Sequence, residues 1–316
     1  MNKAIKGYLL AAIAAAAYGT NPAFAVPLYE DGMNANSVLF FRYILGLPLL
    51  AVLMSCRGMG FALRKSQIVP VAVLGIMMAF SSLTLFESYY YLNAGIASTL
   101  LFVYPILVAV IMIFLFHEKF RISIVACLIL MAMGLIMLMK QEDGATLSSF
   151  GCLLVMVSAL TYALYIIMVN RSATVQQIPT TKLLFYVLVW GSLVFVVKMG
   201  MGTPLSMPAS GTDWINLSAL AFIPTVLSLT CTTIAINIIG STPTAIFGAL
   251  EPVSAVILSY FVLHQPITGR EIVGGILIVL ATTIVIGGEK VDHMILGVRK
   301  MWPKSWIKKH RESQGN

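Results

Sequence analysis

Two stretches of the chain repeat one another: LLFVYPILVAVIMIFLFHEKF at residues 100–120 and IFGALEPVSAVILSYFVLHQPI at residues 246–267. A shift of 147 positions places Pro105 on Pro252, with an apolar run following each proline. Each run is long enough to be part of a helix that crosses a bilayer. The repetition therefore indicates a chain built from two related halves.

A second echo supports this division. Residues 7–18 resemble residues 151–162 with a shift of 144 positions, and each segment begins with Gly and ends with Tyr. Each half holds about five membrane-length apolar segments. An odd number of crossings means that the second half enters the membrane from the opposite side. This inverted repeat is the architecture of many secondary transporters.

The composition is that of a membrane protein. The 316 residues are 59% apolar and 10% charged, with a mean hydropathy of +0.93. Soluble domains carry roughly 25% charged residues. The net charge of +8 does not indicate nucleic-acid binding, because the basic residues lie in short loops and in the C-terminal segment. The lipid bilayer is therefore the expected partner, together with a small-molecule substrate.

We predict an all-α polytopic membrane protein with ten transmembrane helices in two inverted five-helix repeats. The first repeat takes residues 1–143, the second takes residues 144–289, and residues 290–316 form a basic tail. The predicted helices are 7–27, 37–56, 68–92, 96–116, 121–139, 149–169, 180–199, 214–239, 243–263 and 270–288. The fifth and tenth helices are expected at the periphery, packed through Gly134, Gly274, Gly275 and Ala281.

The distribution of basic residues predicts the orientation. With the N-terminus in the cytoplasm, 16 of the 20 basic residues fall on the cytoplasmic side and three on the outer side. The positive-inside rule then places both termini in the cytoplasm of a multi-pass protein of the cell inner membrane. The basic tail is either an amphipathic helix at the headgroup layer or a disordered segment that serves only the topology signal. The oligomeric state, monomer or homodimer, stays open.

Charged residues inside membrane helices are costly and usually face a cavity or a partner. Arg42 and Glu87 each lie about 7 Å from the outer face of the predicted bilayer, so the two are expected to pair. Such a pair is either an outer gate or headgroup site for substrate, or a purely structural salt bridge.

Glu251 lies deeper, roughly 13 Å from the cytoplasmic face, and no basic residue is predicted at that depth. A carboxyl group there suits proton coupling. The alternative is a protonated side chain bonded to backbone groups that Pro252 exposes. Tyr104 and Pro105 reach the same depth from the other side. Two broken or kinked helices are therefore expected to meet near the midplane, where transporters bind substrate.

Several polar or aromatic residues are candidates for lining a substrate cavity. Tyr18 and Tyr162 are related by the repeat and lie near mid-depth, Trp190 lies in mid-helix, and Asn21 lies in the outer third of the first helix. Their rings could stack on a substrate, and their hydroxyl, indole and amide groups could bond to it. The alternative is that they only bond between helices.

Signatures of catalysis and of cofactor binding are missing from the sequence. It contains no HExxH, no GxSxG and no phosphate-binding loop. The four cysteines have no CxxC spacing, and the histidines have no partners at metal-ligand spacing. We expect a protein that is not an enzyme and that uses no cofactor and no metal.

The combination of features resembles the EamA family, the ten-helix branch of the drug/metabolite transporter superfamily. The resemblance covers roughly residues 3–288. It rests on TNPAF at 20–24, LFFRYILGLPLL at 39–50, YP at 104–105, EP at 251–252 and HEKF at 117–120. The chain departs from the pattern in the second half, where Gln265 replaces the usual Glu and Tyr186 corresponds to Arg42.

The resemblance implies a secondary carrier of small metabolites, often amino acids, and commonly an exporter. Alternating access around a midplane cavity lined by helices 1–4 and 6–9 is the expected mechanism. Two other functions stay open: a passive facilitator or channel for small solutes, and a membrane scaffold without transport activity.

Overall fold

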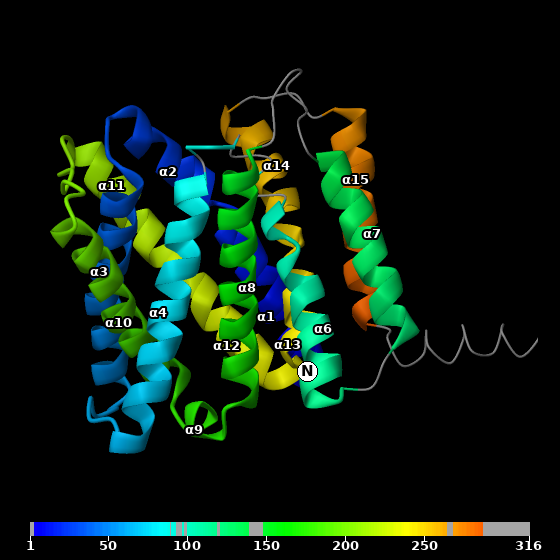
Figure 1. Cartoon of the computed structure of the whole chain (residues 1–316), viewed down its shortest axis with the longest axis horizontal. Helices are drawn as coiled ribbons and strands as arrows, with labels where there is room; N and C mark the ends of the chain where they lie inside the picture. Colours follow the sequence, from blue (N-terminus) through cyan, green and yellow to red (C-terminus); the bar gives the residue numbers. More distant parts are fainter. Residues whose placement is uncertain are drawn as a thin grey trace, which may run out of the picture.

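The computed structural model describes residues 3–88, 90–92, 97, 100–118, 121–138, 148–263 and 268–286. Within these ranges the regular structure is helical throughout (Figure 1). The basic tail expected at 290–316 lies outside the described residues, as does Gln265. The connection between the two halves at 139–147 lies outside them too.

Each predicted span of the first half contains at least one described helix. These helices are α1 (Lys3–Tyr18), α2 (Asn21–Glu30), α3 (Ala35–Cys56), α4 (Lys65–Ser88), α6 (Tyr104–Phe116) and α7 (Ile122–Leu138). The first predicted span is divided into α1 and α2 by a turn at Gly19 and Thr20, just before Pro22. Proline cannot donate a backbone hydrogen bond, and its ring fits best in the first turn of a new helix.

The second half has the same plan with more irregularities. Its elements are α8 (Ser149–Arg171), α9 (Ala173–Gln176), α10 (Thr180–Gly200), α11 (Gly211–Leu220), a π-helical segment η1 (Ala221–Leu227), α12 (Ser228–Ile239), α13 (Ser241–Phe247), α14 (Leu250–Leu263) and α15 (Gly269–Ile286). The eighth predicted span is thus built from α11, η1 and α12, and the ninth from α13 and α14.

The helices have the length and composition of membrane spans. Among the residues that the structure describes, eight helical stretches are long and apolar enough to cross a bilayer by themselves, and two shorter apolar helices cover 104–114 and 122–138. A span needs about 20 residues because the hydrocarbon core is ~30 Å thick. The chain is a multi-pass membrane protein.

Contacts across the bundle repeat between the halves. The Ser81 hydroxyl of α4 donates to the Ser158 carbonyl of α8 at 3.0 Å. In the other half, the residues that correspond to Ser81 and Ser158 are Ser228 and Ala14, by the shifts of 147 and 144 positions. The Ser228 hydroxyl of α12 donates to the Ala14 carbonyl of α1 at 2.9 Å. The inverted repeat is therefore present in the packing as well as in the sequence.

The glycines that begin the repeat follow the same relation. An added Cβ on Gly7 would lie 2.6 Å from Ile239, and one on Gly151 would lie 2.6 Å from Leu92. Ile239 and Leu92 differ by 147 positions, the shift of the long repeat. Each first helix of a half therefore crosses closely over the third long helix of the other half.

The fourth and ninth predicted spans are both broken, as expected. A turn at Phe102 and Val103 precedes α6, and a turn at Gly248 and Ala249 separates α13 from α14. The turns occupy equivalent places in the two halves, immediately before the helices that contain Pro105 and Pro252. Both helices restart near their proline, which is tolerated in the first turn of a helix.

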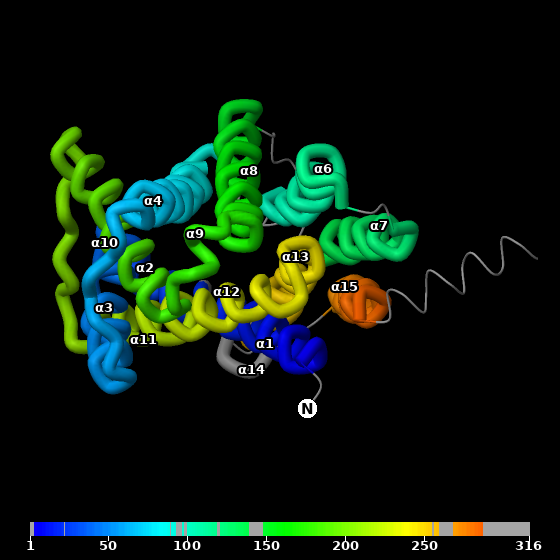
Figure 2. The backbone as a smooth tube through the Cα atoms, turned by 90° about the horizontal axis from the view of Figure 1, so that it is seen from below, coloured from blue at the N-terminus to red at the C-terminus, as the bar shows by residue number. Residues whose placement is uncertain are grey.

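The edge of the bundle is a helix pair. Figures 1 and 2 place α7 and α15 side by side at one end of the molecule, away from α3, α10 and α11. A Cβ on Gly134 would come within 2.7 Å of the Gly274 carbonyl, and the reverse contact is equally short. The expectation that the fifth and tenth helices pack peripherally through small residues is confirmed, although Gly275 faces Val253 of α14 instead.

Candidate functional site

A small polar cavity lies where the broken helices meet. It has a volume of about 30 Å³ and is bounded by α1, α8, α12 and the two broken spans. A space of this size can hold one or two water molecules. The polar side chains that line it are Tyr18, Tyr104, Tyr162, Ser228, Thr232, Thr244 and Glu251. Four of these residues are predicted site residues, and they come from four different helices.

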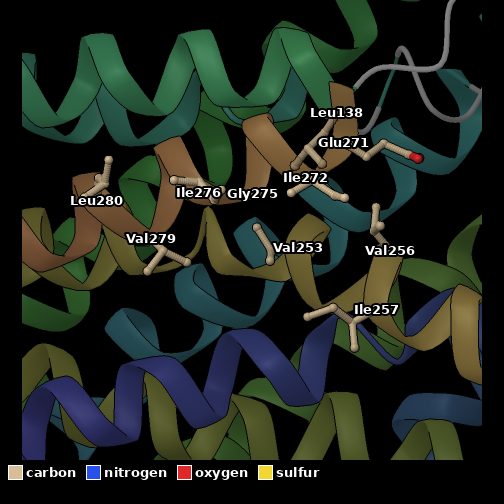
Figure 3. Close-up of a pocket in the computed structure, with 10 residues that line it drawn as sticks. All are labelled: Leu138, Val253, Val256, Ile257, Glu271, Ile272, Gly275, Ile276, Val279 and Leu280. Carbon is tan, nitrogen blue, oxygen red and sulfur yellow. The ribbon is translucent and has the colours of Figure 1, made fainter. Parts of the chain in front are cut away.

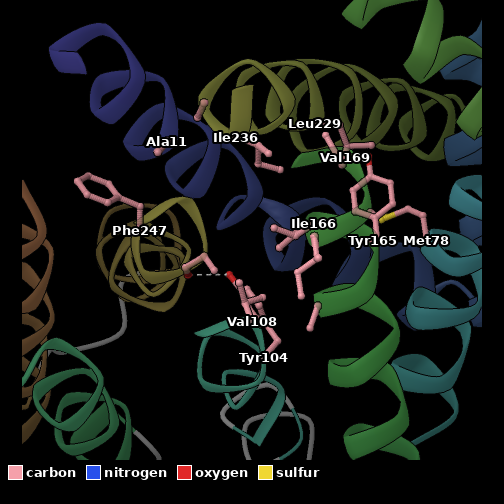
Figure 4. Packing of buried hydrophobic residues seen from close by; sticks show 14 of the residues in the cluster. Ala11, Met78, Tyr104, Val108, Tyr165, Ile166, Val169, Leu229, Ile236 and Phe247 are labelled. Carbon is pink, nitrogen blue, oxygen red and sulfur yellow. Dashed lines mark hydrogen bonds between the residues drawn. The ribbon is translucent and has the colours of Figure 1, made fainter. Parts of the chain in front are cut away.

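The Tyr104 hydroxyl joins the two broken spans. It donates to the Ala245 carbonyl of α13 at 3.2 Å, as the dashed line in Figure 4 marks. A Cβ on Gly248 would lie only 1.8 Å from the same hydroxyl oxygen. The contact therefore requires a residue without a side chain at the break before α14. The predicted meeting of the two broken helices is confirmed.

The tyrosine rings form a continuous aromatic wall. Tyr104 and Tyr162 meet edge to face with ring centroids 4.8 Å apart, and Tyr162 is stacked on Tyr165 at 6.2 Å. Aromatic pairs prefer these geometries because the ring edge is positive and the ring face negative. The wall offers ring faces and hydroxyl groups to anything that enters the cavity.

Arg42 lies beside this cavity, 3% exposed, with its guanidinium carbon 5.4 Å from the centre of the Tyr18 ring. Its Nη1 donates to the Asn21 Oδ1 atom at 3.3 Å. Its Nη2 donates to the Pro224 carbonyl at 3.3 Å, and its Nε donates to the Thr225 hydroxyl. One side chain thus connects α3 with α2, with η1 and with the cavity wall.

The π-helical segment explains how Arg42 finds backbone partners inside the bundle. Pro224 has no N–H, so the regular hydrogen-bond ladder is interrupted there. The chain adds a wider turn, and the Thr225 hydroxyl donates to the Leu220 carbonyl at 2.7 Å. Wider turns of this kind are common at functional sites. Pro224 in the middle of a predicted span is the feature of the sequence that indicates this irregular turn. Its link to Arg42 was not predicted.

The predicted pairing of Arg42 with Glu87 is wrong. Glu87, on α4, forms an ion pair with Lys198 of α10 instead. Both side chains are partly exposed, at 36% for Glu87 and 23% for Lys198. Arg42 faces the interior of the bundle because its partners are on α2 and η1. The helix rotation that separates them could not be read from apolar sequence.

Two further expectations need correction. Trp190 does not line the cavity; it lies on α10 against Gly75 of α4, where an added Cβ would be 2.6 Å from Trp190 Cβ. Glu251 does have a basic group nearby, because Arg42 is close enough for the two charges to interact. Tyr18 contacts Arg42 and lines the same cavity as Glu251. Tyr18 therefore links the basic group of Arg42 to the cavity that Glu251 lines.

The model of the EamA-like transporter family matches this chain twice, over residues 5–140 and 149–287. The chain belongs to the EamA-like transporter family. A solved crystal structure of a protein has the same fold, with a TM-score of 0.80 over 90% of this chain and 98% of the other, at 17% identity. No curated protein matches the chain significantly. Family and fold together indicate a membrane transporter of small solutes.

In this EamA-like chain, hydrogen bonds join separate elements at both ends of the bundle. At the end that carries α9, the Thr242 hydroxyl at the start of α13 donates to the Glu118 carboxylate at 3.3 Å. At the opposite end, the Asn34 amide at the start of α3 donates to the Ser206 hydroxyl and to the Pro204 carbonyl, both at 2.8 Å. Glu118 and Asn34 were not predicted as site residues.

Metal binding finds no support in the part of the chain that the structure describes. Within these residues no group of three or more His, Cys, Asp or Glu side chains is placed to hold an ion. The cavity is lined by one carboxyl group and several hydroxyl groups around aromatic rings, and the guanidinium group of Arg42 lies next to it against Tyr18.

Proposed function

We propose that this protein is a secondary active carrier of small zwitterionic metabolites such as amino acids, and that it exports them. The observation that carries the proposal is that Tyr18 contacts Arg42 and lines, together with Glu251, the cavity at the junction of the two broken helices. Discontinuous helices that meet inside a bundle are where carriers with inverted repeats bind their cargo. The carrier performs no covalent chemistry on its cargo and needs no cofactor.

The proposed chain crosses the inner membrane ten times, with both termini in the cytoplasm. The two short apolar helices, α6 and α7, supply the fourth and fifth crossings. The first repeat extends over 1–143 and the second over 144–289. The end of the bundle that carries α9 is the cytoplasmic end, because Arg171, Lys182 and other basic residues are concentrated there.

The charges suit the two ends of an amino acid. The guanidinium of Arg42 offers donors for a carboxylate, because its planar fork matches the geometry of two carboxylate oxygens. The carboxylate of Glu251 attracts an ammonium group. The ring faces of Tyr18 and Tyr162 are attractive for a cation as well as for apolar carbon. A bound zwitterion would bridge Arg42 and Glu251 across these rings.

Proton coupling is assigned to Glu251. In the absence of cargo, a proton can neutralise this carboxyl group among the tyrosines. Binding of an ammonium group favours the ionised carboxylate, so cargo and proton compete for one site. Export would exchange one for the other across the membrane. The cavity of about 30 Å³ is smaller than a metabolite and must widen before cargo enters.

Transport assays with purified protein in proteoliposomes test the proposal. Amino acids and related metabolites are screened at two pH values, and counterflow is measured for those that bind. We expect saturable counterflow that a proton gradient stimulates, with loss of the stimulation in Glu251→Gln and loss of uptake in Arg42→Ala. The matched control is Gly200→Ala, at a glycine with open space around it.

The outcomes separate the candidate functions. Flux that rises linearly with concentration and resists competition would identify a channel or facilitator instead. Absence of flux for every compound, with no effect of Glu251, Tyr18 or Arg42 substitutions beyond stability, would identify a scaffold. Folded Arg42→Ala protein with normal transport would remove Arg42 from the binding site.

A further inference from the structure

The flank and the interior of the bundle differ in chemistry. A groove of about 340 Å³ between α14 and α15, on the flank, is lined by apolar side chains apart from Glu271 (Figure 3). The Glu271 carboxylate already accepts hydrogen bonds from the amide and the hydroxyl of Thr268. This lining does not suit a polar cargo. Polar groups that could distinguish one cargo from another lie inside the bundle instead.

Three neighbouring hydroxyl groups inside the bundle are buried without a hydrogen-bond partner. They belong to Tyr43 of α3, Tyr165 of α8 and Thr233 of α12, whose side chains are at most 1% exposed. Among the residues that the structure describes, none forms a hydrogen bond with these three oxygens. A buried hydroxyl group without a partner is costly, because it has lost its hydrogen bonds to water. Three of them together therefore require an explanation.

The three groups lie close to one another. The Tyr165 hydroxyl lies beside the Thr233 hydroxyl without reaching hydrogen-bonding geometry, and Tyr43 is near enough to Tyr165 for an electrostatic interaction. The Ser82 hydroxyl of α4 approaches Tyr43 in the same way, and it donates to the Met78 carbonyl at 3.1 Å. Tyr43, Tyr165 and Thr233 are called the hydroxyl cluster below.

Packing holds both phenol rings of the hydroxyl cluster in place. Tyr43 meets Phe195 edge to face with ring centroids 5.0 Å apart, and a Cβ on Gly191 would lie 2.6 Å from its Cε2 atom. Tyr165 is stacked on Tyr162 with the two ring planes only 6° apart. The phenol oxygens are therefore held at defined positions, as groups that recognise a ligand must be.

The hydroxyl cluster lies directly behind the wall of the central cavity. Tyr162, whose ring is stacked on one member of the cluster, lines that cavity. Leu229 lines it too, about one helical turn before Thr233 on α12. On α3, Tyr43 follows Arg42 and is within electrostatic range of its guanidinium group. The widening that cargo requires would therefore bring the cluster into contact with the cavity.

A hydroxyl group on the cargo fits three hydroxyl groups on the protein. It donates one hydrogen bond and accepts two, so it can satisfy three partners at once. A methyl group of the same size would leave all three unpaired. A charged group does not suit the cluster either, because its three members are neutral and the loss of hydration around a charge is far more costly.

We propose that the hydroxyl cluster binds a hydroxyl group on the side chain of the cargo, so that the carrier selects zwitterions with a short, hydroxyl-bearing side chain. This inference rests on the proposed function, in which Arg42 holds the carboxylate of the cargo. Arg42 and Tyr43 are consecutive residues of α3. Groups that neighbouring residues bind are close together in the cargo, which favours a short side chain.

A pair of isosteric amino acids tests this subsite in the purified full chain in proteoliposomes. L-threonine and L-valine have nearly the same shape, with a hydroxyl group in one and a methyl group in the other. Counterflow of each labelled amino acid is measured against its concentration. We expect half-saturation by L-threonine at a concentration lower by about tenfold or more, because a site built to bond a hydroxyl group rejects the analogue without it. Equal half-saturation, the result expected of a cluster that holds only an ordered water, would overturn the subsite.

Variants that remove one hydroxyl group separate recognition from structure. Tyr165→Phe and Thr233→Val should raise the half-saturating concentration of L-threonine toward that of L-valine, which should itself stay unchanged. Thr233→Ser keeps the hydroxyl group and should keep the preference. Tyr90→Phe, the same chemical change at a tyrosine that is 70% exposed, is the control and should alter neither value. Equal losses for both amino acids in Tyr165→Phe would refute the subsite.

Thermal unfolding gives an independent check. Because the Tyr165 hydroxyl has no partner in the described part of the chain, its removal should leave the melting temperature unchanged or raise it. A lower melting temperature with an intact preference for L-threonine would show that this hydroxyl serves the fold, and it would overturn the proposal.

The outcomes for the subsite and for the carrier differ. Saturable counterflow of both amino acids with equal half-saturation would remove the subsite and leave the proposed carrier function in place. Absence of counterflow for every amino acid would contradict both. The measurement on the unsubstituted protein decides the matter even when a variant fails to fold.

Discussion

At the scale of single residues, the site depends on places where a side chain is absent. The Tyr104 hydroxyl reaches the Ala245 carbonyl only because Gly248 leaves room for it. Gly248 has φ −54° and ψ −29°, a helical conformation that any residue adopts. Its requirement is therefore steric rather than conformational.

Substitution Gly248→Ala should destabilise the protein by about 1–3 kcal/mol, the usual cost of forcing a methyl group into a packed interior. The new Cβ would lie 1.8 Å from the Tyr104 oxygen, so the ring or the break must move. Unfolding in detergent by denaturant measures the change. Tyr104→Phe in the same chain should recover part of the loss, because it removes that oxygen. Equal stability of Gly248→Ala and the parent would contradict the argument.

The carboxyl groups of Asp31 and Asp213 make a second residue-scale contact, between the end of α2 and the start of α11. A hydrogen bond with Asp213 and repulsion between the two charges raise the pKa of Asp31 above its ordinary value. The folded state therefore holds this proton more tightly than the unfolded state. Stability from this group grows as the pH falls through the raised pKa, and it is lost toward neutral pH.

Asp31→Asn should accordingly raise the melting temperature at neutral pH and flatten its rise between pH 7 and about 4, the range in which aspartate titrates. An amide can donate to Asp213 without a charge, which removes the repulsion. The measurement is a series of thermal unfolding curves across this range. Glu30→Gln is the control, because Glu30 is the weakest of the influences on Asp31. A lower melting temperature for Asp31→Asn at pH 7 would count against this account.

At the scale of helices, close approach between backbones positions the elements around the cavity. The α7–α15 pair forms the edge of the bundle, and each of Gly134 and Gly274 faces the carbonyl of the other. In a bilayer there is no hydrophobic force between apolar helices, so packing of small residues has to hold them. This edge pair packs in turn against α14.

Gly274→Val should separate α7 from α15 and destabilise the protein by about 1–3 kcal/mol, because a Cβ there would lie 2.7 Å from the Gly134 carbonyl. Thermal unfolding in detergent, with retention of monodispersity as a folding check, measures the effect. Gly200→Ala is the control: it has no neighbour within 4 Å and should be neutral or slightly stabilising. Similar losses in both variants would contradict a specific role for the glycine contact.

At the scale of the whole molecule, an apolar sequence predicts where the helices lie but not which side chains meet between them. The extents of the helices, the two breaks before Pro105 and Pro252, and the peripheral α7–α15 pair follow from hydropathy, proline and glycine. The partners of Arg42 and Glu87 do not. Each residue turns a helix by 100°, and a helix that is apolar on all sides has no periodicity to indicate its rotation. Which charge meets which therefore depends on packing that is set by distant contacts.

The π-helical segment illustrates the same limit. Pro224 in the sequence indicates an irregular helix. It does not predict that a wider turn places the Pro224 carbonyl and the Thr225 hydroxyl where Arg42 donates to them. The repeat also misleads at this point, since the first half has Met77 at the position that corresponds to Pro224. The two repeats can be recognised in the sequence, whereas the contacts of Arg42, which only one repeat contains, are known only from the structure.

At the scale of the whole carrier, alternating access can be tested at the end of the bundle where cargo would enter. The contact between Glu118 and Thr242 joins the fourth and ninth spans at the proposed cytoplasmic end. If cargo enters from that end, these two residues must separate in each cycle. A chain with Cys at both positions, in a background without the four native cysteines, can be joined by a short cleavable bis-maleimide. We expect transport to stop on crosslinking and to return when the linker is cleaved. Each single-Cys chain treated in the same way should remain active. Unchanged counterflow in fully crosslinked protein would mean that this end stays closed throughout the cycle.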